Sequence, residues 1–134
     1  MKIETVDQAH TNVIWSMVEG FIEEALSHSG GDYSVDEART LVNMGHWVLM
    51  VAVEDQRVVG ACTVSFFNRP SARVAFITAI GGRLISSPDT FKQLSTLCKS
   101  FGATQIEGAA RESIARLWKR YGFEEKYRIV GVKI

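Results

Sequence analysis

Three apolar runs separated by short polar turns occupy the middle of the sequence, and they constrain the fold more than any other feature. The runs are Trp47–Val53, Val58–Phe67 and Ala72–Ile80, and they are rich in β-branched residues. Runs this short are typical of strands rather than of buried helices. Because only a few residues connect them, the three strands are predicted to form an antiparallel meander.

Helical patterns precede the meander. After a short predicted strand at Lys2–Thr5, apolar residues recur at helical spacing and predict a long helix that Asp7 caps. A capping box at Ser34–Glu37 predicts the start of a second, shorter helix, because a Ser hydroxyl and a Glu three residues later can satisfy the free amides of the first turn. The apolar stripe of the long helix comprises Val13, Ile14, Met17, Val18, Phe21, Ile22, Ala25 and Leu26.

The C-terminal part of the sequence repeats the alternation of helix and strand. Ser87 as an N-cap, with Pro88 at the first helical position, predicts a helix after the meander. A short strand at Thr104–Gly108, a helix over Glu112–Tyr121 and a final strand over Glu124–Ile134 follow. The sequence therefore predicts an α/β (α+β) fold with about six mostly antiparallel strands and four helices, in the order β-α-α-β-β-β-α-β-α-β.

Length and charge narrow the class of protein. A chain of 134 residues is predicted to form a single domain over residues 1–134. Its 15 basic and 15 acidic residues give no net charge, so neither nucleic acid nor a membrane surface is an expected partner. No apolar run approaches the roughly 20 residues of a membrane span, and no signal-peptide pattern begins the chain. These features predict a cytoplasmic protein, either of a cell or of a virus that replicates in the cytoplasm of its host.

Cysteine and histidine usage does not indicate a metal centre. Cys62 lies in a strand pattern and Cys98 on the apolar stripe of a helix, so both are predicted to be reduced core thiols. The three histidines are spread over different predicted elements. Metal sites need clustered ligands, and no metal is expected.

The order of predicted elements resembles that of the Gcn5-related N-acetyltransferase (GNAT) superfamily over essentially the whole chain. The segment Ala115–Phe123 resembles the last helix of that superfamily running into a Gly-Phe pair, and Glu54–Gly60 resembles a frequent hairpin. The segment Ile80–Gly122 resembles more narrowly a divergent group of small GNAT-like proteins of phages and prophages. In that group a Gly-Gly turn replaces the usual cofactor loop, and an Arg, matched here by Arg111, precedes the last helix.

The resemblance implies acetyl-CoA as the cofactor and an amine of a small molecule or a protein as the acceptor. Members hold the pyrophosphate on amides of a Gly-rich loop at a helix N-terminus, where the helix dipole also favours an anion. Here the glycines come early, Pro88 lacks an amide donor, and Asp89 adds a negative charge. Ser87 with these two residues is equally an efficient helix start that needs no ligand. The candidate cofactor contacts are Thr78, Ile80, Gly81, Gly82, Arg83, Ser86, Ser87 and Arg111.

The catalytic positions implied by the resemblance depart from the usual pattern. The general acid of the superfamily is a Tyr four residues before the Gly-Phe pair, and here that position is Trp118, whose indole cannot supply a proton to a thiolate. Tyr121 and Glu107 are the other catalytic candidates, and both could instead serve packing or solvation. Arg111 stands where members often have an Asn. It could bind a phosphate or carboxylate, or pair with a neighbouring acid such as Glu112 or Glu107.

Three functions are compatible with these residues. The first is acyl-CoA-dependent N-acyltransfer from acetyl-CoA to an amine. The second is a non-catalytic phage or prophage protein that uses a GNAT-like fold as an interaction or assembly module. The third is a binding domain for another anion, centred on Arg111 and Arg83. In each case the final predicted strand would leave an open edge that could pair two copies in a homodimer.

Overall fold

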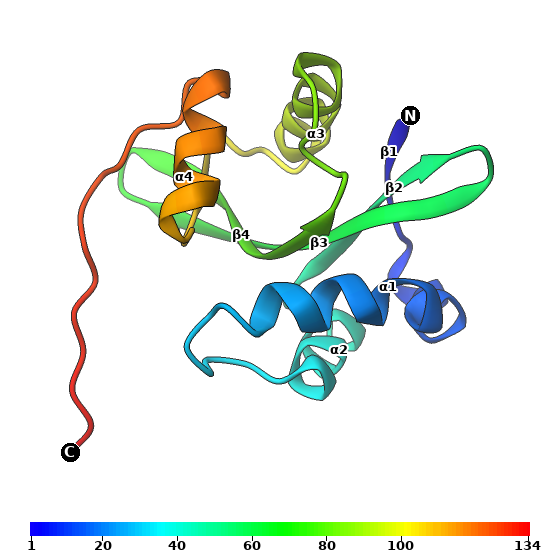
Figure 1. The fold of residues 1–134 in the computed structure, drawn as a ribbon, viewed down its shortest axis with the longest axis horizontal. Coiled ribbons are helices and arrows are strands. Elements are labelled where there is room, and N and C mark those ends of the chain that lie inside the picture. The colour runs from blue at the N-terminus through cyan, green and yellow to red at the C-terminus, as the bar shows by residue number, and fades with distance from the viewer.

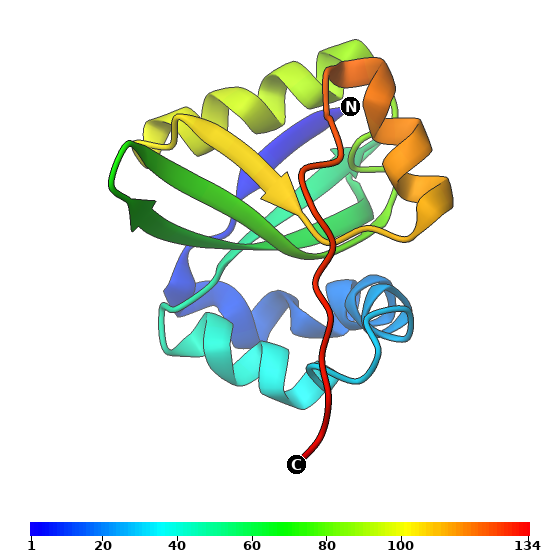
Figure 2. The same ribbon diagram turned by 90° about the vertical axis from the view of Figure 1, so that its left-hand side faces the viewer.

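In the computed structural model, which describes residues 1–134, one five-stranded sheet carries two α-helices on each face (Figure 1, Figure 2). The strand order is β1-β2-β3-β4-β5, antiparallel from β1 to β4 and parallel between β4 and β5. None of the helices combines the length and apolarity that crossing a bilayer requires. The elements are β1 (Lys2–Thr5), α1 (Thr11–Leu26), α2 (Val35–Asn43), β2 (Val48–Glu54), β3 (Arg57–Arg69), β4 (Ala72–Gly82), α3 (Pro88–Ser100), β5 (Gln105–Gly108) and α4 (Glu112–Trp118), with 3-10 turns at Gln8–His10 and Lys119–Tyr121.

The predicted meander and the starts of α2 and α3 are confirmed, because their signals are local. Asp7, predicted to cap the long helix, instead caps the 3-10 turn Gln8–His10 that precedes α1. Asp55 and Gln56 adopt φ of 51° and 63° and close the β2–β3 hairpin in two residues, as left-handed turns do between twisted strands. Ser34 Oγ accepts a hydrogen bond from Glu37 N at 3.1 Å, and Ser87 Oγ accepts one from Thr90 N at 3.1 Å. Both are capping boxes at the predicted positions.

The sheet separates two hydrophobic cores, and β2 contributes to both. Leu49 and Val51 belong to the core under α1 and α2, whereas Met50 and Ala52 belong to the core under α3 and α4. Successive side chains of a strand point to opposite faces, so a strand buried on both faces has an uninterrupted apolar sequence. The apolar run that predicted β2 is therefore explained by burial on two sides.

The buried stripe of α1 is rotated from the predicted one. Trp15, which the prediction omitted, is 2% exposed, whereas Val13 and Met17 are 77% and 59% exposed. The sheet and α2 cover only residues spaced three or four apart from Thr11 through Trp15 to Leu26. Val13 and Met17 lie outside that strip, which hydrophobicity alone could not reveal.

The sixth predicted strand is wrong, because the C-terminal segment Glu124–Ile134 pairs with no strand. It leaves the end of α4 and runs past the edge of the sheet to a free C-terminus (Figure 1, Figure 2). The segment does have a strand-forming sequence. The neighbouring strand β5, however, has only four residues and so offers an edge only about 13 Å long. Most of an eleven-residue strand would have no ladder partner there.

Candidate functional site

The candidate site lies where two parallel strands part. β4 pairs with β3 along its length but with β5 only over Val74–Ile77. Past that point β4 continues as Thr78–Gly82, whereas β5 ends at Gly108. Ligands of open α/β sheets bind beyond the carboxyl ends of parallel strands, at places where neighbouring strands diverge. The parted ends of β4 and β5 are therefore the first place to seek a ligand.

A β-bulge in β4 marks this parting. Thr63 of β3 lies opposite Ala79 and Val64 lies opposite Ile77, so Thr78 has no partner in the ladder. The Thr78 hydroxyl donates to the Thr63 carbonyl at 3.0 Å and lies 2.7 Å from the Thr63 hydroxyl. A bulge bends its strand and changes the direction of the residues that follow. It therefore frees the β5 side of the last residues of β4.

The two glycines at the end of β4 are required by packing. A Cβ on Gly81 would lie 2.4 Å from the carbonyl oxygen of Phe21 in α1, and one on Gly82 would lie 2.4 Å from that of Val59 in β3. Gly82 also has a φ of 71°, which side chains of L-residues rarely adopt. The Gly-Gly pair thus lets the end of β4 pass between α1 and β3. The sequence alone did not indicate this packing role.

Two amides of the turn between β4 and α3 are occupied by a side chain of α3. Ser86 N and Ser87 N donate to Thr90 Oγ1 at 3.1 Å and 3.0 Å. Sequence reasoning missed Thr90, although the Ser-x-x-Thr spacing was a signal for it. Two amides of this turn, those of Leu84 and Ile85, and the amide of Asp89 in the first turn of α3 have no hydrogen-bond partner in the chain. These are the amides that an anion at the start of α3 could use.

The two arginines of the predicted site differ in their surroundings. Arg83 pairs with Glu54 at 2.7 Å. Arg111 is the exposed N-cap of α4, just beyond the end of β5. Neither of the two acids expected to pair with Arg111 does so. Glu112 pairs with Arg116 at 3.4 Å, and Glu107 pairs with Arg69 of β3. Arg111 is thus an available cation near the parted strand ends.

Glu107 ties the sheet together across β4. Its carboxylate accepts hydrogen bonds from both terminal nitrogens of Arg69, from Gln105 and, at 3.1 Å, from Lys126. These bonds, led by those from Arg69, lower the pKa of Glu107 to about 2. Because β4 lies between β3 and β5, the Arg69–Glu107 pair bridges three strands. A role for Glu107 as a base stays a prediction, and its contacts are those of a structural carboxylate.

The two aromatic candidates pack the end of α4. Trp118 is 4% exposed, and a Cβ on Gly108 would lie 3.0 Å from its indole. Its ring centroid also lies 5.0 Å from that of Phe123. The Tyr121 ring stacks on Phe91 of α3, with centroids 5.4 Å apart. Both rings therefore have packing roles, and their catalytic roles stay predictions.

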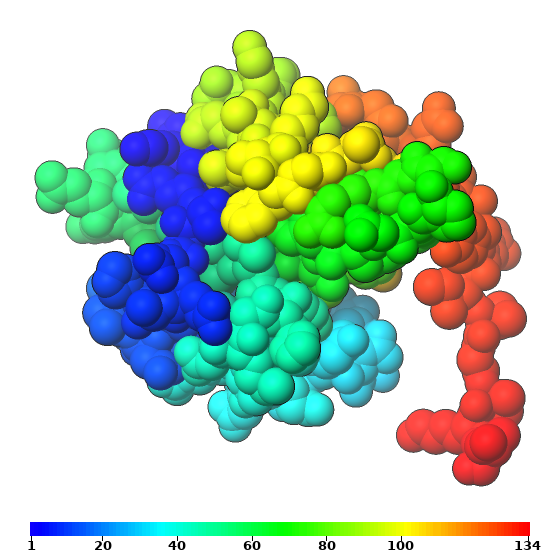
Figure 3. Space-filling view, turned by 180° about the vertical axis from the view of Figure 1, so that it is seen from behind, coloured from blue at the N-terminus to red at the C-terminus, as the bar shows by residue number.

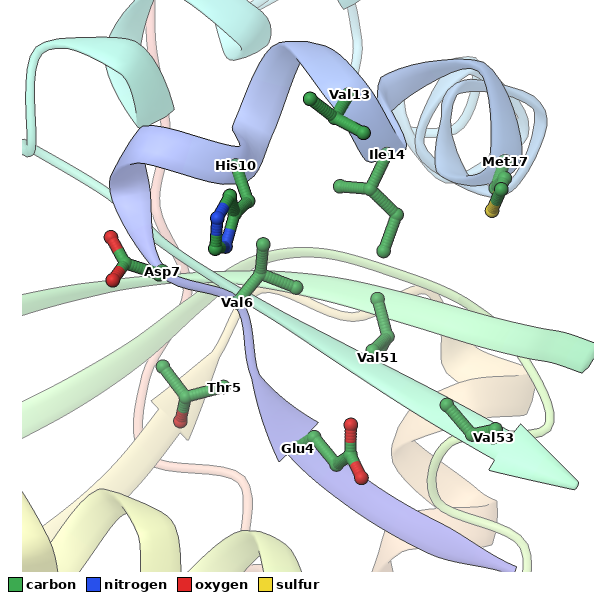
Figure 4. Close-up of a pocket in the computed structure, with 10 residues that line it drawn as sticks. All are labelled: Glu4, Thr5, Val6, Asp7, His10, Val13, Ile14, Met17, Val51 and Val53. Atoms are coloured by element: carbon green, nitrogen blue, oxygen red, sulfur yellow. The ribbon is translucent and has the colours of Figure 1, made fainter. Parts of the chain in front are cut away.

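A pocket of about 500 Å³ lies elsewhere, between α1 and the strands β1 and β2. In Figure 4 the side chains of Val6, Ile14 and Val51 point toward one another in its middle, with His10 at one end. β3 separates β2 from β4 and β5, so this pocket is remote from the parted strands. None of the predicted site residues lines it.

No protein-family model and no curated protein matches the sequence. Solved structures do match the fold. A probable acetyltransferase has a TM-score of 0.71 at 14% identity, covering 100% of this chain and 98% of its own. A predicted acetyltransferase from Clostridium acetobutylicum with acetyl-CoA has a TM-score of 0.66 at 15% identity, covering 98% and 95%. An aminoglycoside acetyltransferase from an uncultured soil metagenomic sample, in complex with sisomicin, has a TM-score of 0.71 at 13% identity, covering 99% and 95%.

The chain has the GNAT fold. At these identities the likeness shows the architecture, and it confirms the α+β class and the four helices predicted from the sequence. The GNAT fold found here has five strands in place of the predicted six.

Proposed function

We propose that this chain is a divergent GNAT protein that binds acetyl-CoA between the parted ends of β4 and β5 and transfers the acetyl group to an amine. The bulge at Thr78 carries the proposal, because it ends the β4–β5 ladder while the strand continues to the turn before α3. A strand edge that is held in place but lacks a neighbouring strand can hydrogen-bond an extended ligand. The amide-containing arm of CoA is such a ligand.

The phosphates of acetyl-CoA would lie at the end of the open β4 edge, near the start of α3. The free amides of Leu84 and Ile85 lie in the turn, that of Asp89 lies in the first turn of α3, and the exposed Arg111 lies beyond β5. Arg binds phosphate oxygens through two parallel hydrogen bonds. The charge of Asp89 opposes an anion in the first turn of α3, so Arg111 supplies most of the attraction.

Positioning is the main contribution to the transfer in this proposal. Holding an acyl carbonyl and an amine together at the right distance can lower a barrier greatly without a strong acid or base. Tyr121 is the proposed proton donor to the leaving thiolate, because its hydroxyl takes part in none of the hydrogen bonds within the chain. The proton that the attacking amine loses passes to solvent, from which Tyr121 is reprotonated. Trp118 is assigned to packing, since its indole is buried against Gly108. Glu107 is assigned to holding β3, β4 and β5 together.

A second candidate is a non-catalytic GNAT-like protein, of the phage and prophage type, that serves as an interaction module. The observation that favours it is the turn before α3, where Thr90 already occupies the amides of Ser86 and Ser87. These two amides are therefore not available to a phosphate. This candidate predicts a stable domain with no affinity for CoA.

Calorimetry with acetyl-CoA separates the two candidates. We expect the wild type to bind, and Arg111→Ala to bind at least about tenfold more weakly, the equivalent of about 1.4 kcal/mol. Arg116→Ala is the matched control, because Arg116 is also an exposed cation of α4 but contacts Glu112. It should bind like the wild type.

Transfer is then followed with sisomicin, the ligand of the soil acetyltransferase with this fold, and with a lysine-rich peptide as acceptors. Acetylation of either amine supports the transferase. Absence of binding heat refutes acetyl-CoA binding and leaves the second candidate. Binding without acetylation of either acceptor refutes transfer to these two amines and leaves only cofactor binding.

A further inference from the structure

The exposed side of α1 carries apolar residues that the fold does not bury. Val13 and Met17, spaced four residues apart on one side of the helix, are 77% and 59% exposed. Both line the pocket of about 500 Å³ between α1 and the strands β1 and β2. In Figure 4 they lie across this pocket from Val6, Val51 and Val53. A single copy of the chain therefore leaves an apolar pocket that no side chain of its own fills.

The surroundings of this pocket are negatively charged. Its lining includes Glu4 and Asp7 but no Lys or Arg. Glu24 lies seven residues after Met17, and therefore on the same side of α1, about 10 Å further along the helix. Carboxylates thus surround an apolar centre. A ligand that combines apolar groups with positive charges matches this arrangement.

Charge is also divided unevenly along the chain. Lys2 is the only Lys or Arg before Arg39, whereas the same stretch holds eight acids, namely Glu4, Asp7, Glu19, Glu23, Glu24, Asp32, Asp36 and Glu37. Glu4 pairs with Lys2 at 3.2 Å. Glu24 lies 4.0 Å from His28, and the other acids form no ion pair.

The helices α1 and α2, which hold most of these acids, gather on one side of the molecule. They are blue to cyan in Figure 3, and α3 and α4 lie on the other side. Because the whole chain has no net charge, the residues after Ala38 are positive to the same extent as the earlier ones are negative. The pocket therefore lies on the negative side of the molecule, which attracts a positively charged partner.

The neighbouring strand edge indicates the form of the partner. An extended peptide would need the outer edge of β1, but Gln93 of α3 already accepts a hydrogen bond from Ile3 N at 2.8 Å and donates to Met1 O at 3.0 Å. A helix needs no strand edge, because its backbone groups bond within the helix itself. Val13 and Met17 also have the spacing of four at which two helices interlock their side chains. A helix laid along α1 therefore suits the pocket best.

The chain itself is a poor source of that helix. Symmetric pairing of two copies through this pocket would bring the acids of one copy against the same acids of the other, and like charges repel. Within one chain, the basic helix α4 lies on the opposite face of the sheet, over a different core (Figure 1). A separate protein is the better match.

We propose that the pocket between α1, β1 and β2 binds a basic amphipathic helix of a partner protein. The apolar side of that helix packs between Met17 and Val53, and its Lys or Arg side chains contact Glu4, Asp7 and Glu24 around the pocket. An amphipathic helix in an apolar groove is a common form of recognition, and Met suits it because its side chain adapts to different shapes. The interaction is independent of acetyl transfer, because none of the predicted site residues lines the pocket.

Fluorescence anisotropy of a labelled peptide tests the interaction in the full chain. The probe is a short helical peptide of Leu and Lys in amphipathic spacing, and a second peptide has Glu in place of every Lys. The Lys peptide should bind saturably, and more weakly as salt is added, because salt screens exposed charges. The Glu peptide should not bind.

Two methionine variants locate the binding surface. Met17→Lys removes an apolar contact and adds a like charge, so the Lys peptide should bind it at least about tenfold more weakly. Met44→Lys is the matched control, because Met44 is similarly exposed, at 62%, but follows α2 and does not line the pocket. It should bind the peptide like the wild type. Val13→Gln removes an apolar contact without a change of charge, and it should also weaken binding.

Several results would overturn this inference. The first is a wild type that does not bind the Lys peptide. The second is an equal loss of binding in Met17→Lys and Met44→Lys, which would show attraction to the overall charge alone. The third is equal binding of the Glu peptide, which would show apolar adhesion alone. Self-association of the wild type that Met17→Lys abolishes would assign the pocket to a second copy instead.

Calorimetry with acetyl-CoA keeps this test separate from the proposed transferase. Met17 is exposed and remote from the parted ends of β4 and β5, so Met17→Lys should bind acetyl-CoA like the wild type while it loses the peptide. Loss of both ligands in this variant would show damage to the fold. Val13→Gln would then decide, and peptide binding equal to that of the wild type would overturn the inference.

Discussion

The two halves of β4 are supported in different ways. The first half, Ala72–Ile77, lies between β3 and β5 and is bridged by the Arg69–Glu107 ion pair. The second half, Thr78–Gly82, has a ladder only with β3 and is held by close backbone packing against α1. A strand that is fixed on one side and open on the other can accept a ligand without losing its shape. The difference between the halves is thus the structural basis of the proposed cofactor site.

The largest effect on the free energy of unfolding is expected from a substitution that adds atoms where the second half of β4 packs closely against α1. In Gly81→Ala the new Cβ would lie 2.4 Å from the Phe21 carbonyl oxygen, so backbone must move, at a cost of about 3 kcal/mol or more. The free energy of unfolding in urea measures this cost. Gly20→Ala is the control, because nothing lies within 4 Å of its Cβ. It lies inside α1, where Ala should stabilise by about 0.5–1 kcal/mol. Equal stability of Gly81→Ala and the wild type would contradict the packing account.

A smaller effect is expected at the bulge itself. Thr63 is fully buried, and its hydroxyl is satisfied by Thr78 at 2.7 Å. Thr78→Val removes that partner and should destabilise by about 1–3 kcal/mol, the cost of a buried polar group left unpaired. Thr78→Ser keeps the hydroxyl and should retain most of the stability. If the Val and Ser variants unfold at the same urea concentration, the hydrogen bond between the two threonines does not support the bulge.

The smallest effect concerns the Arg69–Glu107 ion pair across the first half of β4. It appears as a pH dependence of the free energy of unfolding. The pKa of Glu107 is lowered in the folded state to about 2 from an ordinary 4.5. The contribution of ionised Glu107 to the free energy of unfolding is therefore full above about pH 4.5 and is lost as the pH falls toward 2. Glu107→Gln should be less stable than the wild type at neutral pH, and the two should converge in acid. Urea midpoints from pH 6 to pH 2 measure the difference, with the exposed Glu124→Gln as control. Parallel curves for Glu107→Gln and the wild type would show that the bridge does not stabilise β4.

The sequence predicted what depends on near neighbours. The hairpin at Asp55 and the caps at Ser34 and Ser87 were confirmed because each is formed by residues a few positions apart. The packing purpose of Gly81 could not be predicted, because it depends on the backbone of α1, far away in the sequence. The same holds for the pairing of Glu107 with Arg69, which requires the strand order of the sheet.

Local sequence patterns also could not predict which face of a helix is buried or whether a strand finds a partner. Val13 and Trp15 are both apolar residues of α1, and only the position of the sheet decides that Trp15 is the buried one. The segment Glu124–Ile134 has a strand-forming sequence, but a strand also needs a partner of sufficient length. The catalytic and cofactor roles of the predicted site residues stay predictions, because they depend on a ligand.

The most direct test of the central claim is the response of individual backbone amides to acetyl-CoA, followed by proton–nitrogen NMR. The account predicts saturable shifts for Thr78–Gly82 and for the free amides of Leu84, Ile85 and Asp89, while the amides of β2 stay unchanged. Shifts confined to the pocket between α1 and β1, or no shifts at all at saturating acetyl-CoA, would contradict it.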